Sequence, residues 1–147
     1  MKAGKLPLDL LTKLLQTIPN EDPRVVVGPR SGEDAAVIDM GDHYLVTKTD
    51  PITFATDLLG WHVVQINAND IAVMGATPKW FMSTLLLPEG TSEKQISSIF
   101  QQISKACTDL GITLVGGHTE ITYDFPRPIA IGCMLGEVDK ENVIFTS

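Results

Sequence analysis

The spacing of apolar residues predicts two long helices, over 57–75 and 92–110. In the second segment apolar residues recur every three or four positions, which is the period of an amphipathic helix. Ser92 and Gln95 fit a capping box at its start. The first segment is apolar on most sides, which indicates a buried helix. Leucines at helical spacing predict a further short helix over 8–18.

Alternating or continuous apolar runs predict the strands. They cover 35–40, 43–50, 79–88, 112–115 and 127–138. The first two are separated by Gly41 and Asp42, which favours a hairpin. The segment 25–34 is interrupted by two glycines and a proline, so we expect a loop there.

This order of elements predicts an α+β fold, with a mixed four-stranded sheet and its helices on one face. The strand over 127–138 has small residues on one side, among them Ala130, Gly132 and Gly136. We expect a second sheet to approach that side closely. The sheets of two copies would then pair in a homodimer.

Composition narrows the possible partners. The chain has 147 residues, enough for one domain, and a formal net charge of -7. That charge argues against non-specific binding to nucleic acid or to an acidic membrane surface. No apolar run reaches the length of a membrane span and no signal peptide is recognisable, so we expect a cytoplasmic protein. Cys107 and Cys133 have no metal-ligand spacing, and we expect both to be buried reduced thiols.

Four acidic residues differ from ordinary surface carboxylates, because each lies at the end of an element, inside a helix or beside glycines. They are Asp34, Asp50, Asp70 and Glu120. Hard oxygen ligands from several segments suit Mg²⁺, usually with a nucleotide phosphate completing the coordination shell. We therefore predict these four as metal ligands.

Asp70 is the most informative of the four, because it lies within the apolar helix and shares a helix face with Asn67. A buried carboxylate must pair, take up a proton or bind a metal. The alternative to a metal ligand is a buried acid that caps a loop or pairs with Lys48 or Lys79.

Glycines and hydroxyls supply candidate contacts to an anion. Backbone N–H groups can approach a phosphate closely at Gly28, Gly32, Gly116 and Gly117, although no Walker A or GxGxxG motif is present. The candidate side-chain contacts are Lys48, Thr49, His118 and Thr119. Each candidate has an alternative. The glycine pair could form a tight turn, and His118 could be a structural histidine held by hydrogen bonds. Thr49 and Thr119 could form local backbone bonds, and Lys48 could be a solvated surface residue.

Four segments, "SGEDAAVI", "LVTKTD", "NANDIAVMGATPKWF" and "LVGGHTEI", occur here in order. Together they resemble the aminoimidazole-ribonucleotide synthetase superfamily over about 25–138. The superfamily includes hydrogenase-maturation proteins, thiamine-monophosphate kinase and selenophosphate synthetase. The first motif usually reads Gly-Asp-Asp, and here Glu33 replaces the first acid. Most relatives carry an acid where His118 stands.

The resemblance implies an ATP-binding amino-terminal domain that dimerises through its sheets, with ATP and Mg²⁺ near the interface. It places the metal-binding acids of the superfamily on the same four positions, and the glycine pair beside the phosphates. We add Asn67 to the candidate ATP contacts. The implied organisation is a lead-in over 1–24, the domain over 25–140, and at 141–147 the start of a linker to a second domain.

The function that the resemblance implies is the ATP- and Mg²⁺-binding half of an enzyme that phosphorylates a small substrate oxygen. The hydrogenase-maturation branch and its relatives resemble this chain most. The alternatives are a domain like that of thiamine-monophosphate kinase or selenophosphate synthetase, or a non-catalytic dimerisation module. No catalytic residue can be assigned, and a complete reaction is not implied for this domain alone.

Overall fold

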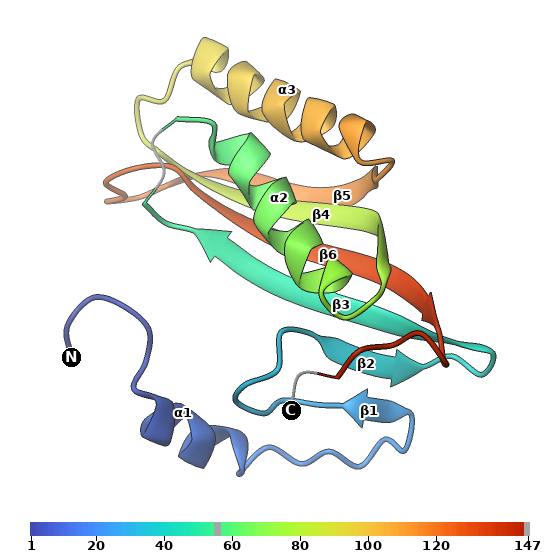
Figure 1. Ribbon diagram of the computed structural model, residues 1–147. Helices are drawn as coiled ribbons and strands as arrows, with labels where there is room; N and C mark the ends of the chain where they lie inside the picture. The colour runs from blue at the N-terminus through green and yellow to red at the C-terminus, as the bar shows by residue number, and fades with distance from the viewer. Residues whose placement is uncertain (55–56, 146–147) are drawn as a thin grey trace.

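The computed structural model describes residues 1–54 and 57–145 (Figure 1). Three helices are present within these ranges: α1 (Leu8–Leu15), α2 (Leu59–Ala72) and α3 (Glu93–Asp109). The strands are β1 (Val25–Val27), β2 (Ala36–Asp39), β3 (His43–Ile52), β4 (Thr77–Pro88), β5 (Thr113–Thr122) and β6 (Ile129–Asp139). In the described part of the chain, no helix is both long enough and apolar enough to span a membrane.

The strands form one mixed sheet of six strands, in the order β1-β2-β3-β6-β4-β5. Neighbouring strands are antiparallel except β4 and β5, which are parallel. The α+β class and the mixed sheet are confirmed, but the predicted number of four strands was wrong. The segment predicted as a loop over 25–34 contains β1, in which Val25 pairs with Ile38. Its three residues are too short a run to show the alternation of a strand.

Helix α3 begins as the sequence predicts. The Ser92 side chain accepts a hydrogen bond from the Gln95 backbone N–H, and the Gln95 side chain accepts one from the Ser92 backbone N–H. This reciprocal capping box satisfies two N–H groups that the first helical turn leaves unpaired. Helix α2 begins differently, because its N-cap residue Leu58 has a left-handed backbone and provides no side-chain cap.

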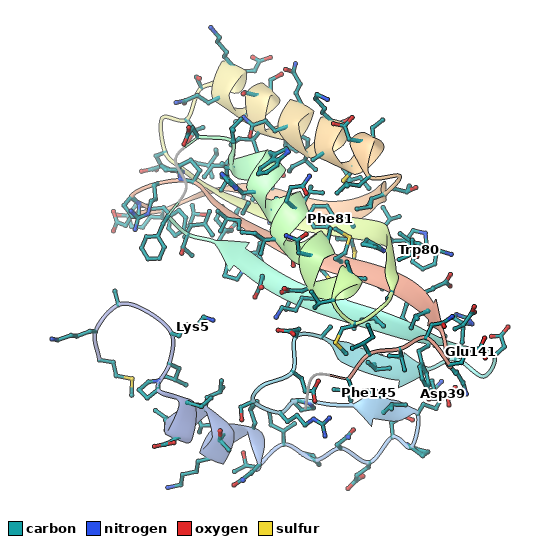
Figure 2. All side chains as sticks on the ribbon, in the orientation of Figure 1. Lys5, Asp39, Trp80, Phe81, Glu141 and Phe145 are labelled. Carbon is teal, nitrogen blue, oxygen red and sulfur yellow. The ribbon has the colours of Figure 1, made fainter. Side chains whose placement is uncertain are left out.

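Helices α2 and α3 lie on the same face of the sheet (Figure 1). Alternate residues of the central strands point toward them and are buried; in β4 these are Phe81, Ser83, Leu85 and Leu87. Phe81 has no exposed surface and lies beneath α2 (Figure 2). We call this the helix face of the sheet. The opposite side, which no helix or strand of the described residues covers, is the open face.

The small residues of β6 lie on the helix face, not on a surface between two sheets. A Cβ atom at Gly132 would clash with Asn67 of α2, and one at Gly136 would clash with Ile71 of the same helix. The expectation that these glycines admit a second sheet was therefore wrong: they admit α2. The open face instead carries the larger residues of β6, including Ile131, Cys133 and Leu135.

Helix α1 stands apart from the sheet and its helices (Figure 1). None of its residues is buried, and Leu8 and Leu14 are exposed. A hydrogen bond of 2.9 Å joins the hydroxyls of Thr12 and Ser31. Helix α1 therefore contributes little to the core, which lies between the sheet and the pair α2 and α3.

Candidate functional site

A lysine and two carboxylates meet where β3 passes beneath α2. The Nζ atom of Lys48 lies 3.6 Å from Asp50 Oδ2 and 3.2 Å from Asp70 Oδ2. Lys48 and Asp50 are two residues apart on β3, so both side chains point to the helix face, where α2 presents Asp70. We call these three residues the acid cluster. The predicted alternative for Asp70, a pairing with Lys48, is thus what the structure shows.

The acid cluster carries more negative than positive charge. Burial raises the pKa of the Asp70 carboxyl above its usual value, its hydrogen bond with Asp50 raises it further, and Lys48 opposes both effects. The side chains of Lys48 and Asp70 are 21% and 24% exposed, so solvent reaches them. An accessible acid whose ionised form is disfavoured is characteristic of functional sites. A bound cation would stabilise the ionised carboxylate.

Asn67 of α2 hydrogen-bonds to the backbone of Asp50. Its Oδ1 accepts a hydrogen bond of 2.9 Å from the Asp50 N–H, and its Nδ2 donates to the Asp50 carbonyl at 3.2 Å and to the Val63 carbonyl at 2.8 Å. Asn67 has no exposed surface. Its predicted contact with a nucleotide therefore does not fit this structure, in which its amide is turned entirely toward protein.

Asp34 lies in the loop before β2, and it lines a cavity of about 490 Å³ together with Gly28, Lys48 and Thr49. Lys48 therefore connects this cavity to the acid cluster. Gly32 is exposed in the same loop, with a φ of +91° that favours glycine.

The hydroxyl of Thr49 is already engaged, because it donates a hydrogen bond of 2.8 Å to the Gly132 carbonyl. This bond goes to the backbone of β6, 83 residues away in the sequence, and is not the local backbone bond that we gave as the alternative for Thr49.

Glu120 does not join the other acids. It lies on β5 opposite Leu86 of β4, and His118 lies opposite Thr84. Both β4 residues alternate with the buried ones, so Glu120 and His118 point to the open face, away from the acid cluster. His118 Nε2 lies 3.2 Å from Glu120 Oε2. Within residues 1–54 and 57–145, no three His, Cys, Asp or Glu side chains gather closely enough to hold a metal ion.

The segment that contains Gly116 and Gly117 is part of β5, and the tight turn that we weighed for it is absent. Gly117 has a φ of +153°, and a Cβ atom there would clash with the Ser83 carbonyl of β4. Gly116, Gly117, His118 and Thr119 line a separate cavity of about 300 Å³ against α3. Eight of the ten predicted nucleotide contacts are thus divided between two cavities, on β3 and on β5, whereas Gly32 and Asn67 line neither of them.

The separation of these two groups follows from the order of the strands. Asp50 is opposite Gly132 of β6, Gly132 is opposite Ser83 of β4, and Ser83 is opposite Gly117 of β5. Three strand spacings, roughly 14 Å in all, lie between β3 and β5.

The other end of β3 carries a second charged cluster, which the sequence did not suggest. His43 contacts Asp42 through Nδ1 and Glu137 through Nε2 (3.2 Å), and Lys79 Nζ lies 2.6 Å from Glu137 Oε2. We call these residues the histidine cluster. The contact with Lys79 lowers the pKa of the Glu137 carboxyl, and the hydrogen bond with Asp42 raises the pKa of His43. The cluster brings together strands 94 residues apart in sequence, which no local pattern reveals.

A cavity of about 900 Å³, larger than the two described above, was also not predicted. It lies where the first turns of α2 and α3 meet the connection between β5 and β6. Its polar lining includes Asp57, Lys94, Gln102 and Arg127. Glycine and proline mark turns at 88–90 and 126–128, but such signals do not show that two turns adjoin.

Comparison with known proteins identifies related sequences. Residues 32–138 match the family model described as AIR synthase related protein, N-terminal domain. A thiamine-monophosphate kinase of Pyrococcus horikoshii is 33% identical over 96 residues, which cover 60% of this chain and 31% of the relative. A selenide, water dikinase of Aeromonas salmonicida is 33% identical over 135 residues, 84% of this chain and 36% of the relative.

A putative hydrogenase expression/formation protein of Methanocaldococcus jannaschii is 28% identical over 123 residues, 80% of this chain and 37% of the relative. The chain thus spans between 31% and 37% of the length of these three relatives.

Solved structures share the fold. A ThiL protein complexed with AMPPCP and TMP superposes with a TM-score of 0.72 at 21% identity, over 93% of this chain and 42% of that one. The hydrogenase maturation protein HypE in complex with ATP superposes with a TM-score of 0.57 at 19% identity, over 90% of this chain and 36% of that one.

Proposed function

Because this chain belongs to the family of AIR synthase related proteins and carries its N-terminal domain, we propose that it binds ATP with Mg²⁺. In the whole enzyme, this domain would support phosphorylation and activation of a small substrate oxygen. The observation that carries the proposal is the acid cluster, in which the carboxylates of Asp50 and Asp70 share one lysine. The ATP and AMPPCP bound by two proteins of the same fold support it.

The acid cluster fits Mg²⁺ by its donor chemistry. This ion prefers oxygen ligands and is commonly held by one or two carboxylates, with waters and substrate phosphates in the remaining positions. Asp50 and Asp70 would hold it, with Asp34 at the neighbouring cavity as a third candidate. When bound, Mg²⁺ neutralises charge on the phosphates as the terminal phosphoryl group is transferred.

Residues of the adjoining cavity would bind the phosphates. Lys48 supplies a positive charge, and the loop around Gly28 and Gly32 supplies backbone N–H groups without side chains that block approach. Binding of Mg²⁺ would also free Lys48 from its two carboxylates, so that its ammonium group could turn toward a phosphate.

The predicted site residues of β5 are distant from the acid cluster. They are Glu120, His118, Thr119 and the glycine pair. We propose that a second copy of the chain covers the open face in a homodimer. Ile131, Cys133 and Leu135 would provide apolar contact area, and the side chains of His118 and Glu120 would then lie at the interface, whereas Thr119 and Gly117 are on the helix face. Glu120 remains a candidate metal ligand in that assembly.

The related proteins differ in the substrate that their names give. Thiamine-monophosphate kinase, selenide, water dikinase and a hydrogenase expression/formation protein all match this chain. The shared part is the ATP-using half, so the proposal extends to ATP and to an oxygen acceptor and does not choose among these branches.

Calorimetric titration with AMPPCP, in the presence of Mg²⁺ and then of EDTA, tests the proposal. We expect saturable binding that requires Mg²⁺. Binding of equal affinity in EDTA would remove the role of the acid cluster. Absence of binding in both buffers would favour the alternative, a non-catalytic dimerisation module of the same fold.

A further inference from the structure

The side chain of Asn67 takes the place of part of the strand pairing beside Asp50. The Met40 N–H donates to the His43 carbonyl at the β2–β3 turn, so the even-numbered residues of β3, Asp50 included, direct their backbone groups toward β6. The Asp50 N–H and carbonyl both bond to the Asn67 amide. An amide that receives one hydrogen bond and returns another to the same residue reproduces the pairing that a neighbouring strand provides.

Asn67 is itself fixed. Its Nδ2 also donates to the Val63 carbonyl one turn earlier in α2, and its side chain has no exposed surface. A buried amide whose hydrogen bonds are satisfied has one favoured orientation, because any rotation would leave a polar atom unpaired. Asp50 is therefore attached at its backbone to a rigid part of the core, while its carboxylate remains 35% exposed beside Lys48.

Gly132 creates the space in which Asn67 lies. It is the residue of β6 opposite Asp50, and a Cβ atom there would fall on the Asn67 amide and on the ring of Phe81. One turn of α2 further along, Gly136 meets Ile71 and the Thr77 backbone in the same way. The two glycines thus allow equally close approach of α2, but only Gly132 adjoins Asn67.

We propose that Asn67 and Gly132 together are positioning residues for the metal-binding carboxylate of Asp50. Asn67 does not contact the nucleotide; it holds the β3 backbone so that the Asp50 side chain stays beside Asp70. Gly132, which has no side chain, leaves the space in which the Asn67 amide lies beside Asp50. The part of this inference that concerns ligand affinity rests on the proposed function, whereas the part that concerns the backbone of Asp50 does not.

The first test compares Gly132→Ala with Gly136→Ala, a matched control on the same strand and face. Both substitutions add a Cβ atom that clashes with a side chain of α2, so both should lower stability. Only Gly132→Ala displaces Asn67, and we expect it to weaken Mg²⁺-dependent AMPPCP binding by roughly tenfold or more, as loss of an outer-shell partner of a metal ligand does. Gly136→Ala should leave the affinity within about threefold of wild type. Equal losses in both variants would overturn the proposal.

The second test needs no ligand. Amide hydrogen exchange measured by NMR reports on the Asp50 N–H, which donates to Asn67 Oδ1. Asn67→Ala and Gly132→Ala should accelerate exchange at Asp50 beyond the change at Val46, which lies on the same strand. In Gly136→Ala the two amides should change in parallel. Unchanged relative protection of Asp50 in folded Asn67→Ala would overturn the proposal, even if Gly132→Ala failed to fold.

The two tests separate this inference from the function on which it partly rests. If wild-type protein binds no AMPPCP with Mg²⁺, the proposed function fails, and hydrogen exchange still decides whether Asn67 holds Asp50. If wild type binds and folded Asn67→Ala binds equally well, the function stands and the positioning role is wrong.

Discussion

The two ends of β3 carry charged clusters that differ in balance. At the acid cluster, two carboxylates share the single cation of Lys48, and burial raises the pKa of Asp70. At the histidine cluster, Glu137 receives Lys79 and His43 together, and its pKa is lowered. The first arrangement retains unneutralised negative charge, and the second satisfies its acids with groups of the same chain.

We interpret this difference as one between a proposed binding site and a structural ion pair. Carboxylates stabilised in their ionised form by protein cations gain little from a metal ion, because the ion would have to displace those partners. A carboxylate whose ionised form is disfavoured gains more. Four kinds of perturbation would break or sharpen the comparison.

The largest effect is expected from removing one charge of the acid cluster. Asp70→Asn or Asp50→Asn should weaken Mg²⁺-dependent AMPPCP binding by roughly a hundredfold, as expected for truncation of one member of a charge pair. Asp42→Asn, at the histidine cluster, is the control and should leave the affinity unchanged. Calorimetric titration measures all three, and an equal loss in Asp42→Asn would remove the distinction between the clusters.

The next largest effect is the loss of stability on removing the lysine of each cluster. Lys48→Met leaves two half-buried carboxylates without a cation, and should lower the free energy of unfolding by about 1–3 kcal/mol in EDTA. Lys79→Met removes a more exposed partner, 44% accessible, and should cost about 0–1 kcal/mol. Urea denaturation gives both values. A larger loss in Lys79→Met would show that the histidine cluster is the more strained of the two.

The increase in thermal midpoint on adding ligand should also distinguish the two clusters. Adding the ion with AMPPCP should raise the thermal midpoint of wild type by ligand linkage. In Lys79→Met the increase should match that of wild type, since this lysine lies outside the acid cluster. A smaller increase in Lys79→Met than in wild type would place the ligand at the histidine cluster.

The smallest effect concerns pH. The hydrogen bond with Asp42 raises the pKa of His43 above its ordinary value of 6.5 in the folded state, and Glu137 adds to the rise. A raised folded pKa stabilises the protein fully below the unfolded value, and this stabilisation disappears as pH rises through the folded value. The difference in thermal midpoint between wild type and His43→Gln should therefore be largest below pH 6.5. A difference that grows toward pH 9 would contradict the assigned geometry.

The sequence predicted those parts of the fold that local signals determine. The capping box of α3 and the hairpin of β2 and β3 both follow from neighbouring residues, and both are confirmed. Strand β1 and the full length of β5 were missed. β1 is only three residues long, and β5 continues through two glycines because it pairs with β4 along its whole length. Such pairing depends on a strand distant in sequence and overrides local propensity.

The structure brings together only some of the predicted site residues. The pairing of Asp70 with Lys48 was an alternative in the sequence analysis, because a buried carboxylate needs a partner. The orientation of Glu120 could not be predicted from the sequence. The pairing of β5 with β4 shifts by one residue between Leu114 and Gly116, and such a shift moves the following side chains to the other face.

The most direct test of the central claim locates the cation. Mn²⁺ can replace Mg²⁺ and broadens the NMR signals of nearby nuclei, so it can be added with AMPPCP to ¹⁵N-labelled protein at substoichiometric amounts. The account predicts that the amide signals of Asp50 and Asp70 broaden first, while those of His43 and Glu137 remain sharp. Preferential broadening at His43 and Glu137, or no preference between the two ends of β3, would contradict it.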